Sequence, residues 1–110
     1  MRYEAPDSIE GAVGLLARTP GACHVLAGGT DLLVRLRSET LEPETILDIK
    51  RIPGMHELTP EDGGWRIGAA VSGAQINEHD GLCAGWPGVA EAGGLIGSTQ
   101  IQGRATLAGN

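Results

Sequence analysis

The sequence predicts an α+β chain, with a small parallel α/β layer first and the start of an antiparallel α+β unit after it. Apolar runs and helical periodicity alternate over residues 1–50 as strand, helix, strand, helix, strand. This alternation is typical of a parallel sheet covered by helices. After Ile52-Pro53-Gly54, a glycine turn and a strand of period two indicate a hairpin. We therefore predict two units, residues 1–54 and residues 55–110.

The first strand and helix are predicted from the opening residues. Arg2-Tyr3-Glu4 is a short strand candidate that Pro6 ends. Asp7, followed three residues later by Glu10, resembles a capping box, with Asp7 as the cap. Thr19-Pro20-Gly21 stops the helix. One apolar face follows the helical spacing: Ile9, Ala12, Val13, Leu16 and Ala17.

A glycine turn between a strand and a short helix is the centre of the sequence. Val25-Leu26 is predicted to end a buried strand, and residues 32–37 to form a helix, which Thr30 or Asp31 can cap. Gly28-Gly29 between them permits a positive φ and a close approach of the backbone to a ligand, most naturally a phosphate. The same pair would also serve as a plain tight turn. Residues 45–49 are predicted as the next strand.

The second half is predicted to open with a hairpin and to continue as helices. Residues 55–58 and 65–71 are the expected strands, with a turn over residues 60–64. Ser72 is predicted to cap a helix, and Pro87 to begin a further one. The later small residues are expected to allow close packing against another backbone: Ala90, Gly93, Gly94 and Gly97.

Composition excludes several functions. The net charge is −6, and the eight Lys and Arg residues form no cluster, which argues against a nucleic-acid-binding protein. Neither a signal peptide nor a long apolar span is recognised, so a cytoplasmic location without a transmembrane segment is expected. Cys23 and Cys83 form no CxxC pair, and the three histidines lack ligand spacing, so no metal is expected. No catalytic residue is recognised, which leaves any chemistry to a cofactor.

Five segments in this order resemble the amino-terminal part of the FAD-binding medium subunit of molybdenum hydroxylases, the carbon-monoxide dehydrogenase and xanthine dehydrogenase family. The resemblance covers nearly the whole chain, and the two glycine motifs are specific in this order and spacing. The segments are Tyr3–Ala12, Leu26–Leu32, Leu47–Gly54, Arg66–Ala69 and Ile96–Asn110.

The resemblance implies the FAD-binding fold of the vanillyl-alcohol oxidase type, with the FAD pyrophosphate between two glycine loops. The first loop would be Ala27, Gly28, Gly29, Thr30 and Asp31, and the second Thr106, Ala108, Gly109 and Asn110. Gly97, Ser98 and Ile101 are expected near the flavin. Ala108 stands where the family usually has a glycine, and Gln102-Gly103-Arg104 where a basic-Asn-basic triplet is common.

The resemblance also implies a function for the intact enzyme. A large subunit would hold molybdenum–pterin and a small subunit two [2Fe–2S] clusters, from which electrons reach FAD and then an external acceptor. Because the family's subunit continues well beyond residue 110, the chain is expected to be a truncated fragment that is inactive alone and holds FAD weakly. Two alternatives stay open: another FAD-dependent oxidoreductase of the same fold, and a non-catalytic module that binds an anion or a partner.

Overall fold

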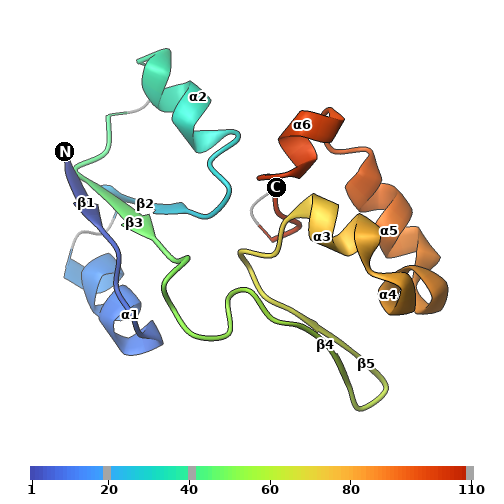
Figure 1. The fold of residues 1–110 in the computed structure, drawn as a ribbon. Helices are drawn as coiled ribbons and strands as arrows, with labels where there is room; N and C mark the ends of the chain where they lie inside the picture. Colours follow the sequence, from blue (N-terminus) through green and yellow to red (C-terminus); the bar gives the residue numbers. More distant parts are fainter. Residues whose placement is uncertain (19–20, 40–41, 109–110) are drawn as a thin grey trace.

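The computed structural model describes residues 1–18, 21–39 and 42–108 and contains two groups of elements. A three-stranded sheet with two helices forms the first group, and a hairpin with four helices forms the second (Figure 1). The segment that joins them runs from the end of the sheet to the hairpin. The molecule is elongated and thin, with extents of 42 × 31 × 17 Å.

The sheet of the first group is parallel, as the sequence predicted. Its order is β1 (Arg2–Glu4), β3 (Thr45–Asp48) and β2 (Cys23–Leu26). All four residues of β3 are buried, because β3 has a strand on each side of it. The burial includes the two polar ends of this strand, Thr45 and Asp48, as well as its apolar centre, Ile46 and Leu47.

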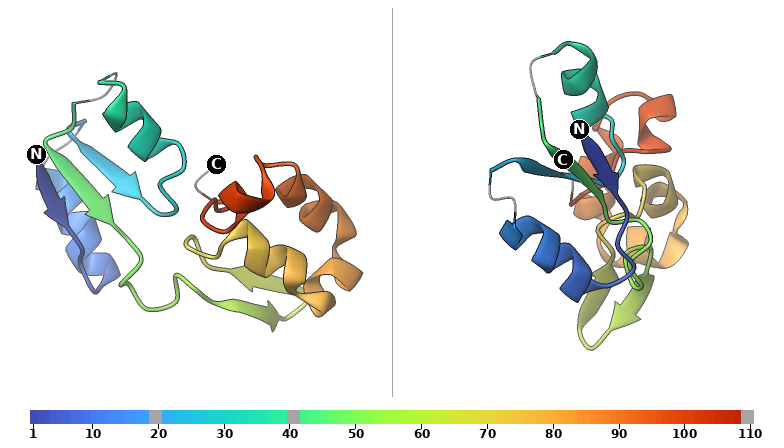
Figure 2. Two further views of the ribbon diagram at one scale, coloured as in Figure 1. Left: turned by 45° about the horizontal axis from the view of Figure 1, so that its top comes forward. Right: turned by 90° about the vertical axis from the view of Figure 1, so that its left-hand side faces the viewer.

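Two helices cover opposite faces of this sheet (Figures 1 and 2). They are α1 (Ile9–Arg18) and α2 (Leu32–Arg37). The chain crosses from β1 past β3 to β2 through α1, and then returns to β3 through α2. Since the two crossovers run in opposite directions across the sheet, right-handed connections require the helices to lie on opposite faces.

Two predictions for α1 are wrong in detail. The cap is Ser8 and not Asp7, because the helix begins at Ile9 and the Ser8 Oγ accepts the Gly11 N–H at 3.0 Å. The buried face is also narrower than predicted. Ala12 is buried and Leu15 packs beside it, whereas the other four expected face residues are exposed. Those four are Ile9, Val13, Leu16 and Ala17.

The hairpin is confirmed, but its first strand begins only where the predicted one ends, and its second strand is shorter than predicted. They are β4 (Leu58–Glu61) and β5 (Gly64–Ile67), which pair in antiparallel register around a two-residue Asp62-Gly63 turn. Gly63 has a positive φ of 73°, a conformation that glycine adopts without a steric penalty. Pro60 lies within β4, where this two-stranded ribbon tolerates its missing N–H.

Four helices complete the second group: α3 (Gly73–Glu78), α4 (Asp80–Gly85), α5 (Pro87–Gly94) and α6 (Thr99–Gln102). The predicted starts of α3 and α5 are confirmed. Ser72 and Gln75 form a reciprocal capping box, and Pro87 is the first residue of α5. The sequence did not predict α4 and α6. The His79 Nδ1 caps α4 by accepting the Leu82 N–H at 3.2 Å.

Each group has its own small apolar core. Ala12, Leu47 and Ile52 form the first core, and Val71, Ile76 and Leu82 the second. No helix among the described residues is both long and apolar enough to cross a membrane.

The predicted role of the α5 glycines is wrong. A Cβ on Gly93 or Gly94 would meet its nearest neighbour at 3.9 or 3.7 Å, which is ordinary contact. Close approach of the backbone is instead required at Gly28 and Gly68, where a Cβ would lie 1.9 and 2.3 Å from a carbonyl oxygen.

Candidate functional site

Two loops from distant parts of the chain line one cavity of about 580 Å³. Residues 27–31 form one wall, and Thr106 and Ala108 contribute to the other. Its other lining residues are His24, Val25, Leu32, Arg35, Ile49, Ala69 and Ala105. The structure thus brings together the described members of both predicted glycine loops. Gly109 and Asn110 lie outside the described residues.

The cavity lies at the carboxyl ends of the parallel strands. Ala27 follows the last residue of β2, and Ile49 follows the last residue of β3. Ligands of parallel α/β sheets bind at this edge, where the loops that leave the strands diverge. The position of the cavity therefore follows from the sheet topology.

Gly28 is where the two loops touch. A Cβ at this position would lie 1.9 Å from the Arg104 carbonyl oxygen and 3.3 Å from the Ala105 Cα. The second loop is itself held by the start of α3, because the Gly73 N–H donates to the Ala105 carbonyl at 2.8 Å. A bridge between Ser72 and Thr106 extends that contact. Only a glycine at position 28 permits this crossing.

Gly29 is required for a different reason. Its φ is +79°, a conformation that side chains rarely adopt. A Cβ here would meet the side chains of Leu33 and Leu26 at 3.0 and 3.1 Å, on the side of the loop that packs against its own flanking elements.

The backbone N–H groups of the first loop are available to a ligand. Among the described residues, none accepts a hydrogen bond from the N–H of residues 28–31. The helix-capping prediction for Thr30 and Asp31 is wrong. Asp31 precedes α2 with helical dihedral angles, and its side chain makes no capping hydrogen bond with the described residues. Both residues line the cavity instead, where His24 and Arg35 supply basic groups.

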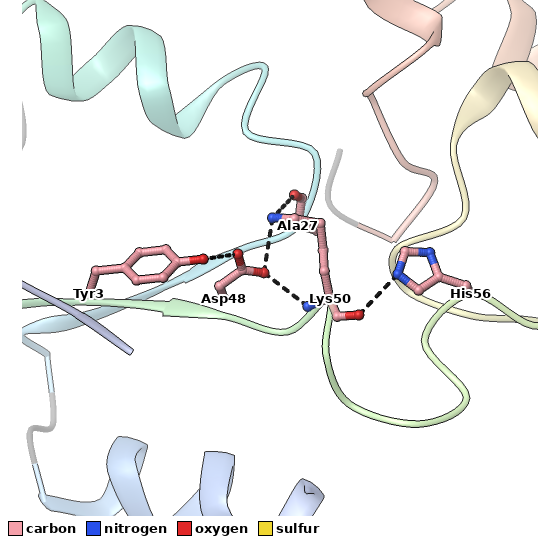
Figure 3. A network of polar contacts seen from close by, with 5 residues as sticks. All are labelled: Tyr3, Ala27, Asp48, Lys50 and His56. Atoms are coloured by element: carbon pink, nitrogen blue, oxygen red, sulfur yellow. Dashed lines mark hydrogen bonds and ion pairs between the residues drawn. The ribbon is translucent and has the colours of Figure 1, made fainter. Parts of the chain in front are cut away.

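A polar network behind the first loop was not predicted (Figure 3). The Oδ2 atom of the buried Asp48 carboxylate accepts a hydrogen bond from the Tyr3 hydroxyl. Its Oδ1 accepts hydrogen bonds from the Lys50 N–H and Nζ, each at 2.9 Å. The Lys50 Nζ also donates to the Ala27 carbonyl at 3.1 Å. The signal that could have found the network was a pair of charged residues at the end of a buried strand.

The network shifts two pKa values. Burial alone raises the pKa of Asp48, but the hydrogen bonds from Tyr3 and from both Lys50 nitrogens outweigh it, and the net pKa is lowered. The pKa of Tyr3 is raised, chiefly because its hydroxyl donates to that carboxylate. Asp48 therefore stays ionised near neutral pH and holds Lys50 in place.

The three residues expected near the flavin lie apart from the cavity lining. Gly97 and Ser98 precede α6, where the Ser98 Oγ accepts the Ile101 N–H at 3.3 Å. None of the three lines the cavity. Their proximity to a flavin stays a prediction. Cys23 and Cys83 are free thiols, and the described residues contain no group of three side chains able to hold a metal ion.

The fold and cavity define a class of protein that binds a large phosphate-bearing ligand. Free backbone N–H groups at the end of a parallel sheet suit a phosphate, and the second loop closes the site from another part of the chain. The chain belongs to the family described as "FAD binding domain in molybdopterin dehydrogenase", whose model matches residues 1–110. Its fold is the α+β FAD-binding fold of that family.

Known proteins of this kind resemble the chain over almost its whole length. The carbon monoxide dehydrogenase medium chain of Hydrogenophaga pseudoflava is 33% identical over 98% of this chain and 38% of that protein. The xanthine dehydrogenase FAD-binding subunit of Escherichia coli O157:H7 is 34% identical over 98% of this chain and 37% of that protein. The chain therefore spans well under half the length of these relatives.

Solved structures show the same fold. A structure of the Hydrogenophaga pseudoflava carbon monoxide dehydrogenase lacking the molybdenum–pyranopterin moiety superposes with a TM-score of 0.92 at 33% identity. It matches 99% of this chain and 38% of the solved chain. A cyanide-inactivated Cu,Mo-CO dehydrogenase has a TM-score of 0.92 at 29% identity, with the same coverage.

Proposed function

We propose that this chain is the FAD-binding part of the medium subunit of a molybdenum hydroxylase. The observation that carries the proposal is the shared cavity, in which the Ala27–Asp31 loop and Thr106 meet across the Gly28 crossing. Its volume of about 580 Å³ is within the range of small-molecule and cofactor sites. The family of the chain is an FAD-binding family, which makes FAD the expected ligand.

The residues of the cavity fit a pyrophosphate. The free N–H groups of residues 28–31 would donate to phosphate oxygens, and Gly28 leaves room for the second loop to complete the site. Thr106 and Ala108, together with Gly109 and Asn110, would form the opposite side. Bound FAD would supply the redox chemistry, so this chain's own residues bind and orient the cofactor and catalyse no acid–base step.

The partners are proposed from the relatives. Molybdenum hydroxylase complexes combine a medium subunit with large and small ones, and we propose that electrons reach FAD from [2Fe–2S] clusters in a small subunit, downstream of a molybdenum–pterin large subunit. The names of the relatives cover carbon monoxide, nicotinate, xanthine and caffeine dehydrogenases. Such diverse substrates beside similar FAD subunits support a role in electron transfer. The proposed division into residues 1–54 and 55–110 would place one glycine loop in each unit.

The test is FAD binding by the complete protein that carries this sequence. We expect the purified protein to show flavin absorbance, or to gain it on titration with FAD, at about one FAD per chain. Co-purification with subunits that contain iron, sulfide and molybdenum would support the family assignment. A protein that stays colourless at saturating FAD would contradict the proposal and favour a non-catalytic module. Flavin without those partner subunits would favour another FAD-dependent oxidoreductase.

A further inference from the structure

Lys50 connects the end of the sheet to the first glycine loop. It lies two residues beyond β3, and its Nζ is 2.9 Å from the Asp48 Oδ1 and 3.1 Å from the Ala27 carbonyl oxygen (Figure 3). The Asp48 side chain is only 8% exposed and is held from its other oxygen by the Tyr3 hydroxyl. The ammonium group is therefore fixed between a buried carboxylate and the backbone of the loop.

The Ala27–Gly28 peptide separates two cavities. Ala27 and Gly28 line both the 580 Å³ cavity and a smaller one of about 230 Å³, whereas Lys50 lines only the smaller one. The Ala27 carbonyl accepts the Lys50 hydrogen bond and so is directed to the Lys50 side of the peptide. In a planar trans peptide, the N–H is directed opposite to the C=O. The Gly28 N–H is thus directed away from Lys50, and no described residue accepts a hydrogen bond from it.

We propose that Lys50 is a positioning residue for the cofactor loop. By holding the Ala27 carbonyl, Lys50 keeps the Gly28 N–H directed into the larger cavity, where it donates to a phosphate oxygen of the cofactor. Its positive charge also polarises the peptide and strengthens that N–H as a donor. Without Lys50, the peptide loses the contact that selects its orientation. This inference rests on the proposed function, in which FAD occupies the larger cavity.

The test compares three variants of the complete protein: Lys50→Met, Lys50→Arg and Arg51→Met. Lys50→Met removes the donor and the charge, whereas Lys50→Arg keeps a cationic donor. Arg51→Met removes a neighbouring exposed charge and controls for general attraction of an anionic ligand. The readouts are the dissociation constants for FAD and for ADP, which corresponds to the adenosine diphosphate part of FAD, with circular dichroism to confirm folding.

We expect Lys50→Met to lower the affinity for both FAD and ADP about 10- to 100-fold, which corresponds to the loss of roughly one charge-assisted hydrogen bond. Lys50→Arg should recover most of the affinity, and Arg51→Met should stay within about 2-fold of the parent, as expected for a screened surface charge. Parental affinity in folded Lys50→Met, or equal losses in Lys50→Met and Arg51→Met, would overturn the inference. If Lys50→Met does not fold, Lys50→Gln replaces it under the same criteria. Failure of the parent to bind FAD would instead contradict the proposed function.

Discussion

The loop at Gly28-Gly29 and the hairpin turn at Asp62-Gly63 are two short glycine turns with different requirements. Gly29 and Gly63 have nearly the same positive φ, +79° and +73°. At Gly63 no described atom other than those of its chain neighbours lies within 4 Å of the position of a Cβ, whereas at Gly28 a Cβ would lie 1.9 Å from a carbonyl oxygen. The hairpin glycine satisfies a local conformation, and Gly28 permits contact between distant segments.

The polar contacts beside the two turns differ in the same way. Behind the glycine loop, Asp48 is buried and bonds to Tyr3 and Lys50. In the hairpin, the Arg66 Nη2 lies 2.7 Å from the Glu61 Oε1, and both side chains are more than half exposed. Solvent screens the electrostatic attraction between Arg66 and Glu61, but it screens the buried Asp48 contacts much less. Substitutions at matched positions in the two regions should therefore have unequal effects.

Gly28→Ala should have the largest effect. Its Cβ would overlap the Arg104 carbonyl, so the two loops must separate. We expect FAD binding to fall below detection and the free energy of unfolding to fall by about 1–3 kcal/mol, as for overpacked sites. Isothermal titration with FAD and urea unfolding measure the two effects. Parental FAD affinity would show that the crossing does not form the site.

Gly29→Val should have the second-largest effect on FAD binding. A β-branched residue is strained at a φ of +79°, and its Cβ would crowd Leu33 and Leu26. Rearrangement of the loop would cost about two charge-assisted hydrogen bonds to FAD, on the order of 10²–10⁴-fold in affinity. Gly63→Val is the matched control, because it imposes the same backbone strain, about 1–3 kcal/mol, away from the cavity. Equal FAD affinity in both folded variants would favour the plain-turn interpretation of Gly28-Gly29.

The Asp48 carboxylate should stabilise the fold in a pH-dependent manner. Its pKa is lower in the folded state than its unfolded-state value of about 3.9. The stabilisation is therefore fully present above that unfolded value and is lost as the pH falls through the folded-state pKa. At pH 7 we expect Asp48→Asn to cost about 1–3 kcal/mol and Glu61→Gln less than about 1 kcal/mol.

Urea unfolding of the parent and both variants between pH 7 and pH 3 measures these differences. The gap between the parent and Asp48→Asn should narrow at the acid end. A gap that is constant over this pH range would show that the charge of Asp48 contributes nothing to stability.

Gly14→Ala should have the smallest effect, and of opposite sign. Gly14 lies within α1, and apart from its chain neighbours and the backbone of its own helix, no described atom lies within 4 Å of the position of its Cβ. Replacing a glycine in a helix interior by alanine stabilises a protein by about 0.5–1 kcal/mol. Thermal unfolding should show a small rise in melting temperature with unchanged FAD affinity. A loss of stability would indicate that the α1 surface is covered in the complete protein.

The sequence by itself determined the elements that depend on near neighbours. The parallel pairing of β1, β2 and β3 was predicted from alternating strand and helix patterns, although their order in the sheet was not. The starts of α3 and α5 were predicted from Ser72 and Pro87. The glycine loops were identified by their motifs, and the cavity unites their described residues. Capping, proline placement and periodicity depend on residues that are close in the sequence, so the sequence alone can predict them.

Only the tertiary structure decided which glycines matter and why. Nothing near Gly28 in the sequence indicates that its partner is the backbone of Arg104, or that Lys50 holds the Ala27 carbonyl. The helices α4 and α6 were not predicted, because six and four residues are too few to show a helical periodicity. Contacts between distant segments arise when the folded chain packs on itself, so the pattern of neighbouring residues does not predict which segments meet.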